Sequence, residues 1–128
     1  MIRALICLVL LAAPVQAQEQ QCRLALLLGL DVSASVDEAE HQLQRDGLIA
    51  ALLAPEVQEP LFAGPGPVAL GIYEWSGRFQ QQVISPWRLI RTEAELALVI
   101  DELQTTPRST GEFPTAIGYA LAYASEMF

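Results

Sequence analysis

The sequence predicts an α/β fold in which helices pack against a partly parallel sheet. Residues 24–30 form an apolar run without alternation, which is typical of a strand buried on both faces. A polar turn and a helix-type pattern follow this run directly, and residues 68–87 contain two further strand-like segments. The expected order of elements is therefore β-α-β-β-α-α.

The first helix is expected to open just after the apolar run. The segment from Ser35 to Glu38 reads S-x-x-E, the pattern of a capping box that closes a helix N-terminus. Apolar residues then recur at helical spacing as far as Ala54, where the following proline disfavours further helix. Residues 55–67 are rich in proline and glycine, so they are predicted to form a loop.

A hairpin is expected next. Val68–Trp75 is the second strand, and Phe79–Trp87 is the third. The Ser76-Gly77 pair between them is typical of a tight turn, and a tight turn forces the two strands to be antiparallel.

Two helices complete the predicted order. A second capping-box pattern runs from Thr92 to Glu95 and opens a helix, which ends in a polar loop over residues 105–112. Pro114 suits the first turn of the last helix, whose apolar face continues to Phe128.

The first strand has too few neighbours in this scheme. A strand buried on both faces belongs inside a sheet, and the hairpin covers only one of its edges. An uncovered apolar edge promotes aggregation. We therefore expect an incomplete sheet whose later strands are missing, in a chain that is a fragment of a longer domain.

The N-terminus has the pattern of a secretory signal peptide. Arg3 precedes an apolar run that is shorter than the ~20 residues needed to span a bilayer, and a V-x-A cleavage pattern ends at Ala17. The protein is therefore expected to be exported, either to the periplasm or to the medium. The expected divisions are a signal peptide (1–17), a polar leader (18–22) and the N-terminal part of one domain (23–128).

Charge and cysteine content limit the classes of partner. The net charge is −8, with 15 acidic residues against 7 basic ones and no lysine. An acidic surface argues against nucleic acid and anionic membrane partners, and no membrane insertion is expected after signal cleavage. Outside the signal, Cys22 is the only cysteine. Either it is a free thiol, or it pairs with a cysteine outside this sequence.

A candidate metal site follows the first strand. Asp31, Ser33 and Ser35 alternate at the carboxyl end of that strand, which is where ligands bind in open α/β sheets. One carboxylate and two hydroxyls suit a hard cation such as Mg²⁺, with the carboxylate acting through water. Thr115, before the last helix, can supply a further oxygen.

Each of these residues also has a structural interpretation. Ser35 can be a plain helix cap, Asp31 can cap the same turn, and Thr115 can lie in the first turn of its helix. His41 is predicted to be solvated rather than a metal ligand, because no second His or Cys stands at metal-binding spacing.

The D-x-S-x-S segment after a buried strand resembles the metal-ion-dependent adhesion site of von Willebrand factor A (VWA) domains. More narrowly, the chain is similar to DUF1194, a group of bacterial exported VWA-like proteins. The supporting segments lie at residues 37–40, 43–45, 74–77, 86–87 and 115–118.

The resemblance implies a Rossmann-like VWA sheet with helices on both faces, strand order 3-2-1-4-5-6 and an antiparallel third strand. It also implies that Ser33, Ser35 and Thr115 ligate Mg²⁺, that Asp31 holds it through water, and that an acidic group of a protein partner completes the shell. VWA domains place another metal-site Asp after the fourth strand, which is absent here.

The expected function is a metal-dependent protein-binding module. One alternative is a metal-dependent phosphate-ester hydrolase that uses Asp31. Phosphatases of that kind usually carry a second acid two residues on, where this sequence has Ser33. Another alternative is an inactive truncated gene product.

Overall fold

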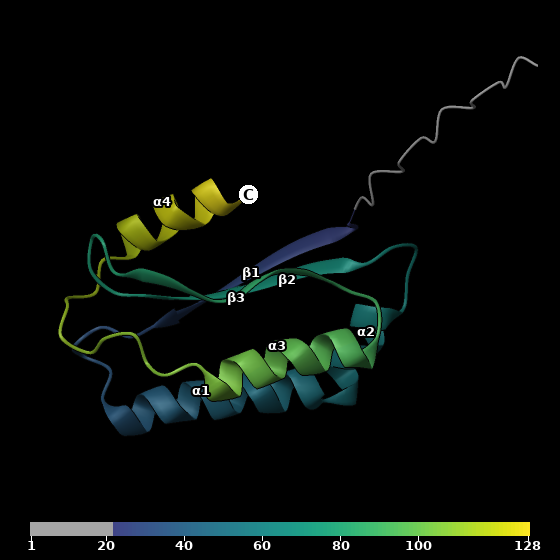
Figure 1. Cartoon of the computed structure of the whole chain (residues 1–128), viewed down its shortest axis with the longest axis horizontal. Helices are drawn as coiled ribbons and strands as arrows, with labels where there is room; N and C mark the ends of the chain where they lie inside the picture. The colour runs from purple at the N-terminus through teal and green to yellow at the C-terminus, as the bar shows by residue number, and fades with distance from the viewer. Residues whose placement is uncertain (1–21) are drawn as a thin grey trace, which may run out of the picture.

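The computed structural model describes residues 22–128 as a three-stranded sheet with helices on both faces (Figure 1). The predicted α/β class with an incomplete Rossmann-like sheet is confirmed. The expected signal peptide and most of the polar leader lie outside the described residues. Among residues 22–128, no helix is both long and apolar enough to cross a membrane. The elements are β1 (Leu24–Asp31), α1 (Glu38–Leu53), α2 (Pro55–Phe62), β2 (Val68–Trp75), β3 (Gln81–Ile90), α3 (Glu93–Thr105) and α4 (Ile117–Met127).

The sheet has the order β1-β2-β3. β1 pairs in parallel with β2, from Leu24 opposite Val68 to Asp31 opposite Trp75. β3 returns antiparallel to β2, as the turn signal predicted. Among the described residues, β1 therefore has one strand neighbour and lies at an edge. The prediction that this strand is buried on both faces is wrong for its first part, because Leu24 and Leu26 are 48% and 36% exposed.

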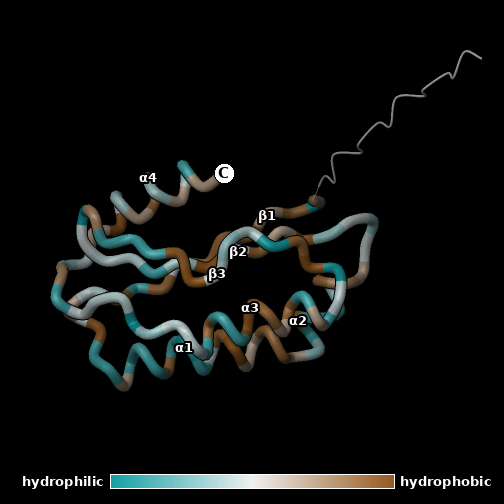
Figure 2. The backbone as a smooth tube through the Cα atoms, viewed as in Figure 1, coloured by the Kyte–Doolittle hydropathy of each residue, from teal (hydrophilic) through white to brown (hydrophobic). Residues whose placement is uncertain are grey.

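The hydrophobic core lies between the sheet and helices α1, α2 and α3. β2 is the central strand, and its residues from Val68 to Glu74 are all buried. Alternate residues of β2 point to the same face, so Val68, Leu70 and Ile72 join the core, and Glu74 follows at the next inward position. Hydrophobic segments accordingly follow the strands and the inner sides of these helices (Figure 2).

Helix α4 covers part of the opposite face. Tyr73, also on β2, donates a hydrogen bond to the Ala120 carbonyl at 3.0 Å, and the Trp87 indole donates to the Met127 carbonyl at 2.8 Å. Burial raises the pKa of Tyr73, and its neighbour Tyr123 adds to the rise. The ring of Tyr73 crosses Gly29 so closely that a Cβ there would lie 2.9 Å from it.

The predicted loop over residues 55–67 is wrong in its first half, which forms α2. Pro55 occupies the first helical turn, where its missing N–H costs nothing, and Pro60 lies inside the helix without ending it. Val57 and Leu61 are one turn apart and pack on the core, which stabilises this short helix. Only residues 63–67 form the loop.

Other element boundaries also differ from the prediction. The third strand begins at Gln81 rather than Phe79 and continues to Ile90, because five residues form the turn after β2. The last helix begins at Ile117, so Pro114 and Thr115 precede it instead of forming its first turn.

Candidate metal centre

The four residues predicted to bind metal come from two segments that meet at one end of the sheet. Asp31 is the last residue of β1, and Ser33 and Ser35 lie in the turn that follows. The Asp31 carboxylate accepts a hydrogen bond from the Ser33 backbone N–H at 2.8 Å, which fixes this turn. Thr115 arrives from the connection between α3 and α4.

Three hydroxyl groups converge there, and we call them the hydroxyl cluster. The Oγ of Ser33 lies 2.8 Å from Thr115 Oγ1 and 3.1 Å from Ser35 Oγ. Ser35 Oγ lies 3.4 Å from Thr115 Oγ1. Ser33 and Thr115 are 82 positions apart in the chain, and the structure brings their side chains together at the place where the sequence analysis expected both. Ser33 is fully buried, so its side chain is held in place by packing as well as hydrogen bonding.

The capping pattern predicted that Ser35 caps α1, and this prediction is wrong. Asp37 is the cap: its carboxylate accepts from the Glu40 N–H at 2.8 Å, and Glu40 accepts from the Asp37 N–H at 2.9 Å. The sequence contains two overlapping capping boxes, and the second is the one formed. The Ser35 hydroxyl is therefore available to the hydroxyl cluster.

Backbone hydrogen bonds hold the Thr115 segment against the strand ends. The Ala34 N–H donates to the Phe113 carbonyl at 2.7 Å, and the Ala116 N–H donates to the Ser76 carbonyl at 3.0 Å. Arg108 adds a side-chain clamp from the same connection, because its Nη2 donates to the Val36 carbonyl at 2.7 Å. The geometry of the cluster therefore depends on the whole connection from 106 to 116.

A buried polar pair supports this connection, and sequence reasoning missed it. Glu74 and His41 are 0% and 2% exposed, and Glu74 Oε1 lies 3.1 Å from His41 Nε2. Glu74 Oε2 accepts from the Ser109 N–H at 2.8 Å. The prediction of a solvated His41 is therefore wrong. The signal was the period-two pattern of β2, which puts Glu74 on the inner face beneath α1.

The donors around Asp31 fit a hard cation held mainly by oxygen and water. Hydroxyl and carboxylate oxygens are ligands that Mg²⁺ accepts, and Mg²⁺ usually keeps several waters. Within residues 22–128, no three His, Cys, Asp or Glu side chains are grouped as a metal cage. A cation at this centre would rely on three neutral hydroxyls and one carboxylate.

The chain was compared with known proteins. Residues 21–128 match a protein family of unknown function, DUF1194. The chain belongs to the DUF1194 family. No curated protein gave a significant match. The DUF1194 match covers both segments of the hydroxyl cluster, so the candidate centre lies within the family region.

Proposed function

We propose that this DUF1194 protein is a VWA-like module that binds Mg²⁺ at the hydroxyl cluster and, through the metal, an acidic group of a protein partner. The observation that carries the proposal is the convergence of Ser33, Ser35 and Thr115 within 3.4 Å of one another. Two distant segments supply these hydroxyls, beside a carboxylate at a parallel strand end.

Each residue has a defined task in this proposal. Ser33 and Ser35 would ligate the ion directly from the turn after β1, and Thr115 would ligate it from the other segment. Their mutual hydrogen bonds would be exchanged for bonds to the cation, so the same oxygens are satisfied with and without metal. Asp31 would hold a metal-bound water, since its carboxylate already accepts from the backbone of Ser33.

Charge supports an acidic partner. A Mg²⁺ ion beside Asp31 leaves one net positive charge, because the other three donors are neutral. In the described part of the chain, no three His, Cys, Asp or Glu side chains form a group that could hold a metal. A carboxylate from a partner would both neutralise that charge and supply an oxygen ligand.

Magnesium titration tests the proposal. Calorimetry on the full chain should detect binding of Mg²⁺ at millimolar concentration or below, and Ser33→Ala should weaken it at least about tenfold. Ser125→Ala is the matched control, because Ser125 is an exposed serine of α4 and should leave binding unchanged. Failure to bind millimolar Mg²⁺, or equal binding by Ser33→Ala, would overturn the proposal.

Export is the second part of the proposal, and it rests on residues 1–17. Expression of the full sequence in a Gram-negative bacterium should give a periplasmic product whose N-terminus is Gln18. N-terminal sequencing and mass spectrometry distinguish this product from an uncleaved chain. A cytoplasmic chain that keeps Arg3 would contradict export without affecting the metal proposal.

A further inference from the structure

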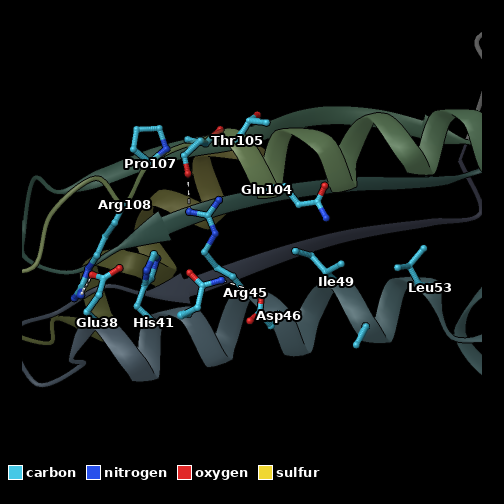
Figure 3. Close-up of a pocket in the computed structure, with 13 residues that line it drawn as sticks. Glu38, His41, Arg45, Asp46, Ile49, Leu53, Gln104, Thr105, Pro107 and Arg108 are labelled. Atoms are coloured by element: carbon cyan, nitrogen blue, oxygen red, sulfur yellow. Dashed lines mark hydrogen bonds and ion pairs between the residues drawn. The ribbon is translucent and has the colours of Figure 1, made fainter.

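A second site lies away from the hydroxyl cluster, in a groove between α1 and the end of α3. The groove has a volume of about 570 Å³. Figure 3 shows residues of α1 on one side and residues 104–108 on the other. We define it as the α1–α3 groove. Its wall from α1 includes His41, Arg45, Ile49 and Leu53, and none of the four candidate metal residues lines it.

Arg45 brings a nearly buried positive charge to this groove. Its side chain extends from α1 toward the end of α3 (Figure 3), and the residue is only 6% exposed. One nitrogen donates to the Thr106 carbonyl at 2.6 Å. Among residues 22–128, no carboxylate forms an ion pair with it. A guanidinium has five N–H donors, and a buried charge is costly unless it is paired.

His41, one turn before Arg45 in the same wall, has one nitrogen without a partner among the described residues. Its Nε2 contacts Glu74, whereas its Nδ1 is buried and has no hydrogen-bond partner in the described residues. Arg45, one turn after His41 on α1, is therefore the residue of this wall whose N–H donors suit an anion.

The charges around Arg45 indicate what kind of anion fits. Arg108 already pairs with Glu38 at 3.6 Å and donates to backbone carbonyls, so it is not free to bind a ligand. Asp46 accepts from Gln42 at 2.9 Å, and its charge repels further negative charge. One carboxylate on Arg45 therefore fits better than a multiply charged anion.

The other end of the groove is apolar. Ile49, Ala50 and Leu53 continue the wall beyond Arg45, and Figure 3 shows Ile49 and Leu53 on the side away from His41. From Arg45 to Leu53 the helix rises about 12 Å. We propose that the α1–α3 groove binds a small monocarboxylate with an apolar tail, its carboxylate on Arg45 and its tail along these residues.

Carboxylates of different tail length test the proposal. The full chain is titrated with sodium hexanoate, sodium acetate or inorganic phosphate in a buffer that contains EDTA. Binding is measured by calorimetry and by the shifts of the backbone amide NMR signals. Hexanoate should bind at least about tenfold more tightly than acetate, because burial of each CH₂ favours binding. Phosphate should bind no better than acetate. EDTA and a parallel Ser33→Ala sample keep this result independent of the magnesium proposal.

Two variants locate the carboxylate and the tail. Arg45→Gln should weaken hexanoate binding at least about tenfold, whereas Arg91→Gln, an arginine paired with Glu95 outside the groove, should not. Ile49→Ser should weaken hexanoate and leave acetate unchanged. If Arg45→Gln does not fold, wild-type amide shifts at Arg45, Ile49 and Thr106 provide the localisation.

Arg45 also has a structural role, because Thr106 is the C-cap of α3 and a cation favours that end of a helix. If this were its only role, Arg45→Gln would lose stability and the wild type would not bind hexanoate. That result would overturn the proposal. Equal binding of the three anions, or hexanoate shifts confined to β1 and α4, would overturn it as well.

Discussion

The two polar regions beside the connection from 106 to 116 satisfy their polar atoms in different ways. The hydroxyl cluster consists of neutral groups that hydrogen-bond to each other, as Ser33 and Thr115 do at 2.8 Å. The region around Glu74 and His41 contains charge-bearing groups that water cannot reach. Neutral hydroxyls cost little when a partner is removed, whereas a buried carboxylate costs several kcal/mol. The first region can therefore serve binding, while the second determines stability.

Removal of the Glu74 carboxylate is expected to have the largest effect. Glu74→Ala should lower the free energy of unfolding by about 3–5 kcal/mol, because it leaves His41 Nε2 and the Ser109 N–H without their partner. Glu74→Gln should lose less, since the amide oxygen can still accept from Ser109. Urea unfolding followed by circular dichroism measures both.

Glu126, an exposed acid on α4, provides the control for this comparison. Glu126→Ala should change the free energy of unfolding by no more than about 0.5 kcal/mol. Equal stability losses in Glu74→Ala and Glu126→Ala would show that the buried pair does not hold the connection.

The cap of α1 is the next largest expected effect. Asp37→Ala should cost about 1 kcal/mol, because the backbone N–H of Glu40 loses the carboxylate that accepts from it. Ser35→Ala should cost clearly less, since the Ser35 hydroxyl does not cap the helix. Urea unfolding of the two variants separates them, and a larger loss in Ser35→Ala would contradict the assignment of Ser35 to the hydroxyl cluster.

Disruption of the hydroxyl cluster should lower the free energy of unfolding only slightly. Thr115→Val keeps the shape of the side chain and removes one hydroxyl that bonds Ser33, so the expected loss is about 1 kcal/mol or less. Thr115→Ser keeps a hydroxyl and is the control. A loss as large as that of Glu74→Ala would remove the distinction between the two regions.

Local sequence patterns predicted the order of the strands, the cap at Thr92 and the meeting of the two segments at the candidate centre, but not the cap of α1 or the buried charges. β2 was predicted with its observed bounds, because Val68 to Trp75 is apolar except for Glu74 and is flanked by turn residues. The meeting of Ser33 with Thr115 was predictable, since strand ends and helix starts share one edge of an α/β sheet.

The sequence could not distinguish two capping boxes that overlap by two residues. Ser35 and Asp37 both stand three residues before a glutamate, and the choice between them depends on where α1 must begin to pack on the sheet. Arg45 was also hidden, because an arginine between apolar helix positions has the sequence pattern of a solvated residue. Its burial follows from the position of residues 104–108, which is set by tertiary packing.

A partly exposed carboxylate, that of Glu95, provides the smallest effect and a reference for the buried carboxylate of Glu74. Hydrogen bonds from the backbone of Arg91 (2.6 Å) and Thr92, with the Arg91 charge, hold the pKa of Glu95 below its usual value of 4.5. A depressed pKa means that ionised Glu95 favours the folded chain. That contribution is complete above pH 4.5 and is lost as the pH falls through the lower pKa of the folded state. In Glu95→Gln, the free energy of unfolding should therefore decrease less steeply as the pH falls below 4.5. Above pH 4.5, its dependence on pH should be the same as in the wild type. Midpoints of urea unfolding measured as a function of pH test this prediction. If the variant loses stability below pH 4.5 as steeply as the wild type, other carboxylates cause the acid sensitivity.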